Sequence, residues 1–456
     1  MIDQVISHIN EQAAARVDRL CEFLKIPSIS TDPQRKGDLL TGAEWVKQQF
    51  EQSGFDTEIV DTAGHPCVLA DTGPADGNEM TVLVYGHYDV QPAGDESLWD
   101  SPPFEPTIRD GAVYARGSAD DKGQLLTHVF AAQSWIAKAG KLPLRIKFVV
   151  EGEEEIGSPN LGGVLKAHKD RLACDYVVLS DTPKYNADIP AITYGTKGMV
   201  YKEINLVGAK QDLHSGSFGG TLLNPGNILA NIISSLKDKD HRVTIPGFYD
   251  KVRDLTKVER ERIAALPFSE EDYARGLGVA SLGGETGYAT LERKWARPTL
   301  DVNGLLTGFT GEGSMTVLPS RAMAKVSMRL VPDQTPEEIG VAFDQAVRSA
   351  CPDGIKLEIK EFVSCSPYVA DLESPGIHAA AAAMKAGFDR EPVFIREGGS
   401  LPILPLFKEV LGADSLMLGF CLPDCNAHGP NEVFLISDLH AGTRSAAHLI
   451  DQLSRV

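Results

Sequence analysis

The sequence predicts an α/β protein in which one discontinuous domain is interrupted by a second, inserted domain. Residues 1–190 alternate apolar runs with helical patterns, which favours a mixed sheet flanked by helices. Residues 191–366 change to strands of alternating apolar and polar residues, which are typical of a smaller α+β sandwich. The first pattern returns over residues 367–456. We therefore expect residues 1–190 and 367–456 to form one domain around the insertion.

The first part of the chain carries two helix signals and three apolar runs. A helix is expected over Ala43–Ser53, because Thr41 and Glu44 form a capping box and Gly54 is a stop signal. A second helix, near Gln124–Ala137, separates the first two apolar runs. The runs predict strands buried on both faces, at Met80–Tyr85, Leu144–Val150 and Tyr176–Leu179.

The inserted domain is expected to contain strands with one wet face, together with two helices. The strands are Val200–Val207, Ala324–Leu330 and Lys356–Phe362, and the helices are Asn227–Leu236 and Pro336–Ser349. The charged stretch Asp250–Arg262 is interpreted as a solvated helix. The last part of the chain predicts a helix, two strands and a final helix, at His378–Ala386, Pro392–Ile395, Ser415–Cys421 and Asp438–Leu453.

Composition and charge exclude several classes of partner. With 63 acidic and 44 basic residues among 456, the formal charge is −19, the wrong sign for nucleic acid or an anionic membrane surface. No window approaches the roughly 20 apolar residues that span a bilayer. The amphipathic segment Met1–Ile26 does not resemble a secretory leader. Seven scattered cysteines therefore predict reduced thiols and a cytoplasmic location, and Cys421 and Cys425 are interpreted as ordinary buried or loop residues.

Residues with metal-binding side chains follow several of the predicted strands. They are His87 and Asp89, the run Glu153–Glu155, Asp181, and His428, with Asp120 and Asp121 just before a helix. Because open α/β sheets bind ligands at the carboxyl ends of their strands, we expect one shared crevice. Two imidazoles among several carboxylates suit zinc, manganese or cobalt better than magnesium or calcium.

Each of these segments also has a simpler structural explanation. A histidine after a strand is commonly a hydrogen-bonded turn residue. The run Glu153–Glu155 could be the solvated first turn of a helix, and Asp120 and Asp121 could be helix caps. The common position at strand ends favours the metal site, because clustered carboxylates would raise one another's pKa unless cations were bound among them.

Seven segments resemble, in order, the motifs of the di-metal exopeptidase and amidohydrolase family. They are Gly86–Val90, Arg116–Gly123, Glu151–Ser158, Ser180–Asp181, Asp212–Gly216, Arg329–Pro332 and Arg396–Ser400. The family contains carnosinases and related dipeptidases, acetylornithine deacetylase and succinyl-diaminopimelate desuccinylase. The resemblance extends from about residue 15 to 450 and is closest to the cytosolic carnosinase-like dipeptidases.

The resemblance implies two divalent metal ions per subunit, zinc first, with manganese or cobalt as alternatives. The implied terminal ligands are His87, Glu155, Asp181 and His428, with Asp120 bridging the two ions. Glu154 would be the general base. Asp89 would hydrogen-bond the far ring nitrogen of His87, and the Asp120–Asp121 peptide would be cis.

The resemblance also implies that the inserted domain is a lid and dimerisation domain of a homodimer. His214 would reach the partner subunit's site and polarise the scissile carbonyl. Arg329 would bind the substrate's free carboxylate, with further substrate contacts from Thr316, Glu397, Gly399 and Ser400. Without the resemblance, Arg329 could equally be a rim salt bridge and His214 a surface-loop histidine.

The leading functional hypothesis is a dipeptidase that hydrolyses an amide next to a free carboxylate, using a metal-bridging water activated by Glu154. One alternative is an N-acyl-amino-acid deacylase or desuccinylase with the same centre, so the substrate is a small peptide or an acyl-amino acid. Another is a catalytically silent metal-binding relative. Two positions depart from the resemblance: Asn303 replaces an expected histidine, and Glu153 adds a third consecutive acid.

Overall fold

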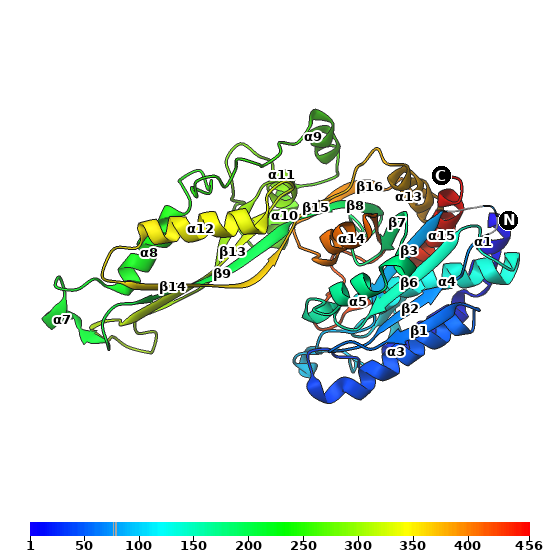
Figure 1. The fold of residues 1–456 in the computed structure, drawn as a ribbon, viewed down its shortest axis with the longest axis horizontal. Coiled ribbons are helices and arrows are strands. Elements are labelled where there is room, and N and C mark those ends of the chain that lie inside the picture. The colour runs from blue at the N-terminus through cyan, green and yellow to red at the C-terminus, as the bar shows by residue number, and fades with distance from the viewer. Residues whose placement is uncertain (76, 78–79) are drawn as a thin grey trace. The chain divides into compact units, whose positions relative to one another are not determined.

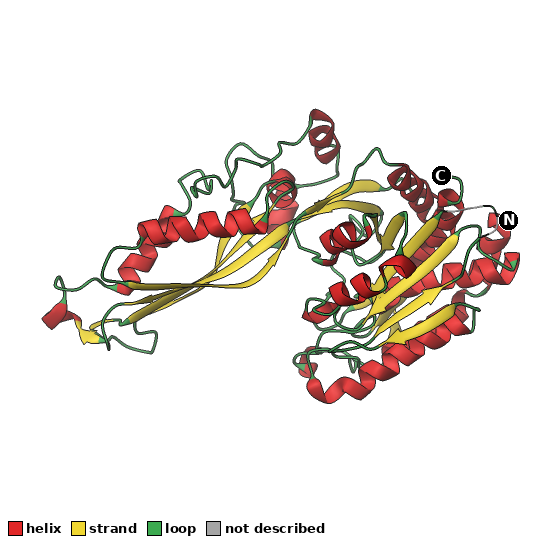
Figure 2. Ribbon diagram, viewed as in Figure 1, coloured by secondary structure: helices red, strands yellow, loops and turns green. Residues whose placement is uncertain are grey.

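The computed structural model describes residues 1–75, 77 and 80–456. They divide into unit 1, residues Met1–Tyr194, Ala370–Ile395 and Leu406–Val456, and unit 2, residues Gly195–Val369 and Arg396–Pro405 (Figures 1 and 2). The main boundaries lie close to the expected positions 191 and 366. The segment Arg396–Pro405 differs, because it groups with unit 2 instead of the α/β domain. Its carbonyls at Glu397 and Gly399 accept hydrogen bonds from the Lys197 backbone amide, at 3.3 and 3.1 Å.

Unit 1 is built on a mixed sheet, as the sequence predicts. Its strands lie in the order β1 (Asp56–Val60), β2 (Cys67–Asp71), β6 (Arg145–Glu151), β3 (Thr81–His87), β7 (Tyr176–Leu179), β17 (Asp414–Gly419) and β8 (Ala191–Thr196). Two more strands pair with β8, namely β15 (Tyr368–Val369) and β16 (Val393–Glu397). The central strands β6, β3, β7 and β17 are mutually parallel, so their carboxyl ends share one edge.

Helices cover both faces of this sheet, which explains why its central strands consist mostly of buried apolar residues. Val82 and Val84 line a small cavity together with Ala446 of α15, while Tyr85 packs edge-on against Phe407 of α14. The helices on the first face pack on one another (Figure 1): α1 (Ile2–Glu11), α2 (Ala13–Leu24), α4 (Lys122–Ala139), α13 (Pro375–Phe388) and α15 (Ile436–Leu453). The remaining helices are α3 (Lys36–Glu51), α5 (Leu161–Ala167), α6 (Lys169–Leu172) and α14 (Ile403–Leu411).

A small sheet and three short 3₁₀ helices complete unit 1. The sheet has the order β18 (Val433–Leu435), β5 (Ala112–Tyr114) and β4 (Thr107–Arg109). The 3₁₀ helices are η1 (Pro33–Arg35), η2 (Glu96–Leu98) and η3 (Glu154–Ile156). The β18–β5 pairing places the chain after His428 beside the chain that leads to Asp120.

Unit 2 contains an antiparallel sheet with the alternation that the sequence predicts. Its order is β11 (Thr299–Thr307), β13 (Arg321–Leu330), β9 (Gly198–Val207) and β14 (Lys356–Cys365). Every second residue of β9 is buried, and three of these residues, Val200, Ile204 and Leu206, form a core with the helices α8 (Pro225–Ser235) and α12 (Pro336–Ala350). The smaller elements are β10 (Leu213–His214), α7 (Ser215–Phe218), α9 (Lys257–Ala264), α10 (Glu270–Gly276), α11 (Thr290–Ala296) and β12 (Val317–Leu318).

Two predicted elements differ from the structure. The helix expected at Ala43 begins at Lys36, so the capping box was wrong: Thr41 lies inside α3 and donates to the Gly37 carbonyl at 2.9 Å. Leu39 extends the buried stripe of this helix by one turn and so favours the earlier start. The charged stretch from Asp250 is helical only from Lys257 onward, where Thr256 provides a capping box.

Two further observations bear on the surroundings of the protein. Among the described residues, no helix is both long and apolar enough to cross a bilayer. All seven cysteines are described and all are free, with Cys421 and Cys425 buried.

Candidate metal centre and substrate-binding residues

The parallel strands bring the predicted metal-binding residues to one edge of the unit 1 sheet. His87 is the last residue of β3, Glu155 lies in η3 just after β6, and Asp181 follows β7. Two groups of side chains offer ligand atoms within 4.8 Å of one another: His87, Asp120 and Asp181 form the first, and Asp120, Glu155 and His428 form the second. Asp120 belongs to both groups.

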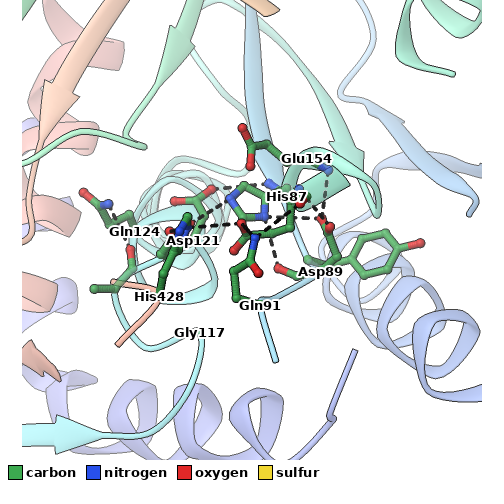
Figure 3. A network of polar contacts seen from close by, with 12 residues as sticks. His87, Asp89, Gln91, Gly117, Asp121, Gln124, Glu154 and His428 are labelled. Atoms are coloured by element: carbon green, nitrogen blue, oxygen red, sulfur yellow. Dashed lines mark hydrogen bonds and ion pairs between the residues drawn. The ribbon is translucent and has the colours of Figure 1, made fainter. Parts of the chain in front are cut away.

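Asp120 lies between the two histidines and faces each with a different oxygen. Its Oδ1 is 3.1 Å from His87 Nε2, and its Oδ2 is 3.1 Å from His428 Nε2 (Figure 3). His428 Nε2 is also 3.2 Å from Glu155 Oε2. The Asp120–Asp121 peptide is cis, as the resemblance implies. A carboxylate with one oxygen on each side is suited to bridging two cations.

Asp89 supports both His87 and the Glu154–Glu155 turn. His87 Nδ1 is 3.1 Å from the Asp89 carbonyl and 3.4 Å from its carboxylate, so the main-chain oxygen is the nearer partner. The Asp89 carboxylate instead accepts the backbone N–H groups of Glu154 and Glu155, at 3.2 and 3.1 Å. The resemblance implied that Asp89 hydrogen-bonds the far ring nitrogen of His87, and the structure places the Asp89 carbonyl there; the hydrogen bonds of its carboxylate to the Glu154–Glu155 backbone were not predicted.

Gln91 is a functional candidate that the sequence did not reveal. Its Nε2 donates to Glu155 Oε2 at 2.8 Å and so orients this carboxylate toward His428 (Figure 3). The one available signal was its position two residues after Asp89. A glutamine in a loop has no motif that would have distinguished it from a solvated side chain.

The electrostatics of the cluster fit divalent cations. Burial raises the pKa of Asp181 well above its ordinary value, that of Asp121 to about 8 and that of Glu154 to about 7, and the nearby Asp120 charge adds to each shift. For His87, burial alone would lower the pKa, but hydrogen bonds to Asp120 and Asp89 raise it. Buried carboxylates that repel one another, next to two imidazoles, form a donor set that divalent cations would stabilise.

The simpler explanations for the acidic residues do not match the structure. Glu153 is buried and accepts hydrogen bonds from the His65 backbone at 3.0 Å and from Asn160 at 2.8 Å, so it anchors the turn instead of facing solvent. Asp121 stands at the N-cap position of α4 but makes no capping hydrogen bond. Its Oδ2 accepts the backbone N–H of His87 at 3.3 Å.

In unit 2, the structure brings Arg329 together with Ser400, on the segment that also carries Glu397 and Gly399. Arg329 Nη1 donates to Ser400 Oγ at 2.8 Å. Within the part of the chain that the structure describes, no carboxylate forms an ion pair with Arg329, so the rim salt bridge is not found. Burial and the Arg329 charge lower the pKa of Lys197 to about 7. Arg329 is therefore a guanidinium that Ser400 orients and that has no anionic partner among the described residues.

His214 lies on the short ribbon formed by β10 and β12, and Thr316 directly precedes β12. The Ser215 backbone donates to the Thr316 carbonyl at 3.0 Å. His214 is exposed, as the surface-loop interpretation expects, but its Nδ1 accepts the Ser217 backbone N–H at 3.1 Å. A ring nitrogen that accepts carries no proton, so the ring N–H is on Nε2, and none of the described residues accepts a hydrogen bond from it.

Asn303, where the resemblance leads us to expect a histidine, lies at an irregular point of the unit 2 sheet. Asn303 lies on the edge strand β11, where the register with β13 shifts between Val302 and Gly304. The residue is exposed at this bulge.

The comparison with known proteins agrees with the metal-binding groups described above. The profile of Peptidase family M20/M25/M40 matches residues 83–452, most of the chain. The chain belongs to this family. The resemblance to di-metal exopeptidases and the expectation of a metallopeptidase are thereby confirmed, and family membership implies divalent metal ions.

Relatives of this M20-family chain match it along nearly its whole length. It is 30% identical to the Cys-Gly metallodipeptidase dug1 of Schizosaccharomyces pombe, over 100% of this chain and 99% of that protein. It is 32% identical to the Beta-Ala-His dipeptidase of Rattus norvegicus, over 100% and 96%. The M20 family metallo-carboxypeptidase Sso-CP2 from Sulfolobus solfataricus has a similar structure, with a TM-score of 0.85 and 34% identity over 97% of this chain and 99% of that one.

Proposed function

We propose that this M20-family protein is a metal-dependent dipeptidase that cleaves an amide next to a free carboxylate. The observation that carries the proposal is the shared Asp120, which joins two three-residue ligand groups near the half-buried Glu154. The names of the two dipeptidase relatives, which this chain matches over nearly their full lengths, support the same substrate class.

The proposed centre holds two divalent cations, zinc first and manganese or cobalt as alternatives. His87, Asp120 and Asp181 would hold one ion, and Asp120, Glu155 and His428 the other. Bound there, the ions would polarise the substrate carbonyl and lower the pKa of water. Asp89 and Gln91 would orient the ligands His87 and Glu155 through the hydrogen bonds described above.

In the proposed reaction, Glu154 takes a proton from the attacking water and delivers it to the leaving amine. Its backbone is fixed by Asp89, and burial favours the protonated state that the second step requires. His214 would donate its Nε2–H to the carbonyl oxygen as negative charge develops there, a contribution of about 3–4 kcal/mol per donor. Arg329 would bind the free carboxylate of the substrate, with contacts from Thr316, Glu397, Gly399 and Ser400.

The positions of His214 and Arg329 support a homodimer formed through unit 2. The ribbon that carries His214 joins the sheet next to Ser320, just before β13 begins at Arg321, whereas Arg329 lies eight residues beyond Arg321 on that strand. At about 3.3 Å per residue, this separates the two positions by roughly 26 Å along the strand. One dipeptide cannot contact both residues of one subunit, so His214 would serve the site of a partner subunit. The free cysteines support a reducing, cytoplasmic location.

A substrate screen tests the proposal. The purified chain is stripped with a chelator and assayed with zinc, manganese or cobalt against dipeptides, their C-terminal amides, and N-acetyl and N-succinyl amino acids. We expect no turnover without metal, recovery with metal, and a preference for dipeptides with a free carboxylate. Release of acetate or succinate in preference to amino acids would instead identify a deacylase. Full activity at zero metal content would contradict the metal centre itself.

A further inference from the structure

Glu432 directly precedes β18, the three-residue strand that leads into the C-terminal helix α15. Its carboxylate is fully buried and accepts hydrogen bonds from four donors. Its Oε1 accepts the backbone N–H groups of Ala119 and Asp120, at 2.9 and 3.0 Å. Its Oε2 accepts the backbone N–H of Gly117 at 2.8 Å and Arg116 Nη1 at 2.7 Å. Charge-assisted hydrogen bonds of this kind are about twice as strong as neutral ones. One side chain thus holds the main chain from residue 116 to residue 120.

Arg116 extends the same network to two other loops. Its buried guanidinium also donates from Nη2 to the carbonyls of Gly429 and Pro92, at 3.0 and 3.3 Å. Gly429 directly follows His428, and Pro92 lies in the loop that begins at His87. The Glu432–Arg116 pair therefore connects the three loops that carry Asp120, His428 and His87, although neither side chain contacts a ligand atom in the described structure.

The local fold explains why the two residues meet. The Ala115 backbone donates to the Glu432 carbonyl at 3.2 Å, which continues the β5–β18 pairing up to the edge of the site. Gly117 has a φ of +83°, and a Cβ there would lie 2.6 Å from a Val90 methyl group. Only glycine permits this close turn. The chain is thereby wrapped around the Glu432 carboxylate.

We infer that Glu432, together with Arg116, is a positioning residue that fixes Asp120 so that its two oxygens face the two histidines before any metal binds. The inference rests on the proposed function, because the position of Asp120 between the two histidines matters if Asp120 bridges two metal ions. Since Asp120 belongs to both ligand groups, loss of this support weakens both metal sites together. Loss of Gln91, which contacts Glu155 alone among the candidate ligands, weakens one site.

Glu432→Gln is a sharp probe because it preserves size but cannot preserve the hydrogen bonds. If the amide nitrogen replaces Oε1, it faces the N–H groups of Ala119 and Asp120. If it replaces Oε2, it faces Gly117 and Arg116. Either orientation places donors against donors. Asp71→Asn is the matched control: it alters another arginine–carboxylate pair of unit 1, with Arg145, at the opposite end of β6.

The experiment uses the full-length chain without metal and then with Co²⁺ as the probe. Hydrogen exchange of a peptide covering residues 116–120 is followed in the metal-free wild type, E432Q, Q91A and D71N. Co²⁺ binding is followed by its visible absorption. We expect faster exchange in E432Q alone, and a loss of about 10–100-fold in affinity for both ions in E432Q but for one ion in Q91A. D71N should match the wild type in both measurements.

Wild-type exchange and wild-type affinity for both ions in E432Q would overturn the inference. If E432Q does not fold, Glu432→Asp replaces it. Aspartate keeps the charge at a shorter reach, so Co²⁺ affinity should be lowered for both ions with the fold intact, and unchanged affinity would again contradict the inference. Failure of the proposed function is distinguishable, because then the wild type itself would bind no Co²⁺, whereas the exchange result would stand.

Discussion

Asp120 and Glu154 belong to one cluster of carboxylates, but their surroundings suit them to different tasks. Burial would raise the pKa of Asp120, yet hydrogen bonds to His428 and His87 hold it below the ordinary range. Burial raises the pKa of Glu154 to about 7, with additional repulsion from Asp120 and Glu155. Asp120 therefore stays anionic and suits a ligand, whereas Glu154 exchanges protons near neutrality and suits a base.

Replacing Glu154 with glutamine tests this division at the level of one residue. Glu154→Gln should keep the fold and the metal content but lower kcat by about three orders of magnitude or more, because the residue that moves the proton is gone. Turnover, metal content by mass spectrometry and the thermal midpoint are measured together. Glu153→Gln is the control, since Glu153 anchors His65 and Asn160 and should affect stability more than rate. Near-normal turnover of Glu154→Gln would contradict the assignment.

At the scale of single residues, the sequence predicted the metal-binding side chains but missed residues whose hydrogen-bond partners lie far away along the chain. His87, Asp120, Glu155, Asp181 and His428 follow predicted strands or open a helix, and the structure brings them together. Glu432 gave no signal, because its four partners lie more than 300 residues away in the chain and no periodicity marks such a contact. The nearest partner of His87 Nδ1, the Asp89 carbonyl, could not be predicted either, because every residue has a backbone carbonyl and the sequence does not show which one accepts a hydrogen bond.

At the scale of elements, the common direction of the parallel strands determines where the metal-binding residues lie. Most residues of the parallel strands β3, β6, β7 and β17 are buried and apolar, because helices cover both faces, and these strands were predicted well. In the unit 2 sheet, the edge strand β14 was predicted but the opposite edge strand, β11, was missed. In β11 most residues are exposed and a bulge interrupts the register, so its sequence lacks a clear alternation. The segment Arg396–Pro405 was assigned to the wrong unit because only tertiary hydrogen bonds, to Lys197 and Arg329, determine where it packs.

The pair of Asp71 and Arg145 links β2 to β6 and gives a prediction about pH. Arg145 donates to both oxygens of Asp71, at 2.9 and 2.6 Å. Burial would raise the pKa of Asp71, but the hydrogen bonds from Arg145 and from the Gly73 backbone hold it below the ordinary value. A carboxylate with a depressed pKa stabilises the fold above its unfolded-state pKa of about 3.9 and loses this effect as the pH falls.

Asp71→Asn should therefore lower the free energy of unfolding at pH 7 by about 1 kcal/mol. The difference from the wild type should shrink as the pH falls below about 4, where the wild-type carboxylate becomes protonated. Urea unfolding followed by circular dichroism from pH 3 to pH 7 measures both quantities. Glu58→Gln, which removes an exposed pair with Arg171, should change the stability much less. A difference that does not vary with pH would show that the charge of Asp71 is not its source.

At the scale of the whole molecule, the sequence predicted two units and their approximate boundaries because the style of the strands changes between them. The pattern of apolar residues could not predict how subunits assemble, because exposed residues such as His214 are not part of any hydrophobic periodicity. The distance along β13 supplies the missing argument. The β10–β12 ribbon that carries His214 lies at the start of β13 and Arg329 lies near its end, so a site that needs both requires two copies of the chain.

Mixing two inactive variants tests the assembly. In a dimer of one His214→Ala subunit and one Glu154→Gln subunit, one site would combine the intact Glu154 of the first subunit with the intact His214 of the second. The other site would lack both. Random exchange at equal concentrations makes half of the dimers mixed, and each has one intact site of two. The mixture should therefore recover about a quarter of the wild-type activity.

The control for this experiment pairs Glu154→Gln with Asp181→Asn. Both residues belong to unit 1 and would serve the same site, so every mixed dimer retains one defect in each site and no activity should return. Subunit exchange is verified independently by co-purification of two differently tagged chains. Exchange without recovery in the His214→Ala mixture would place His214 in the site of its own subunit or outside the reaction, because a residue acting across the dimer must complement a defect in its partner.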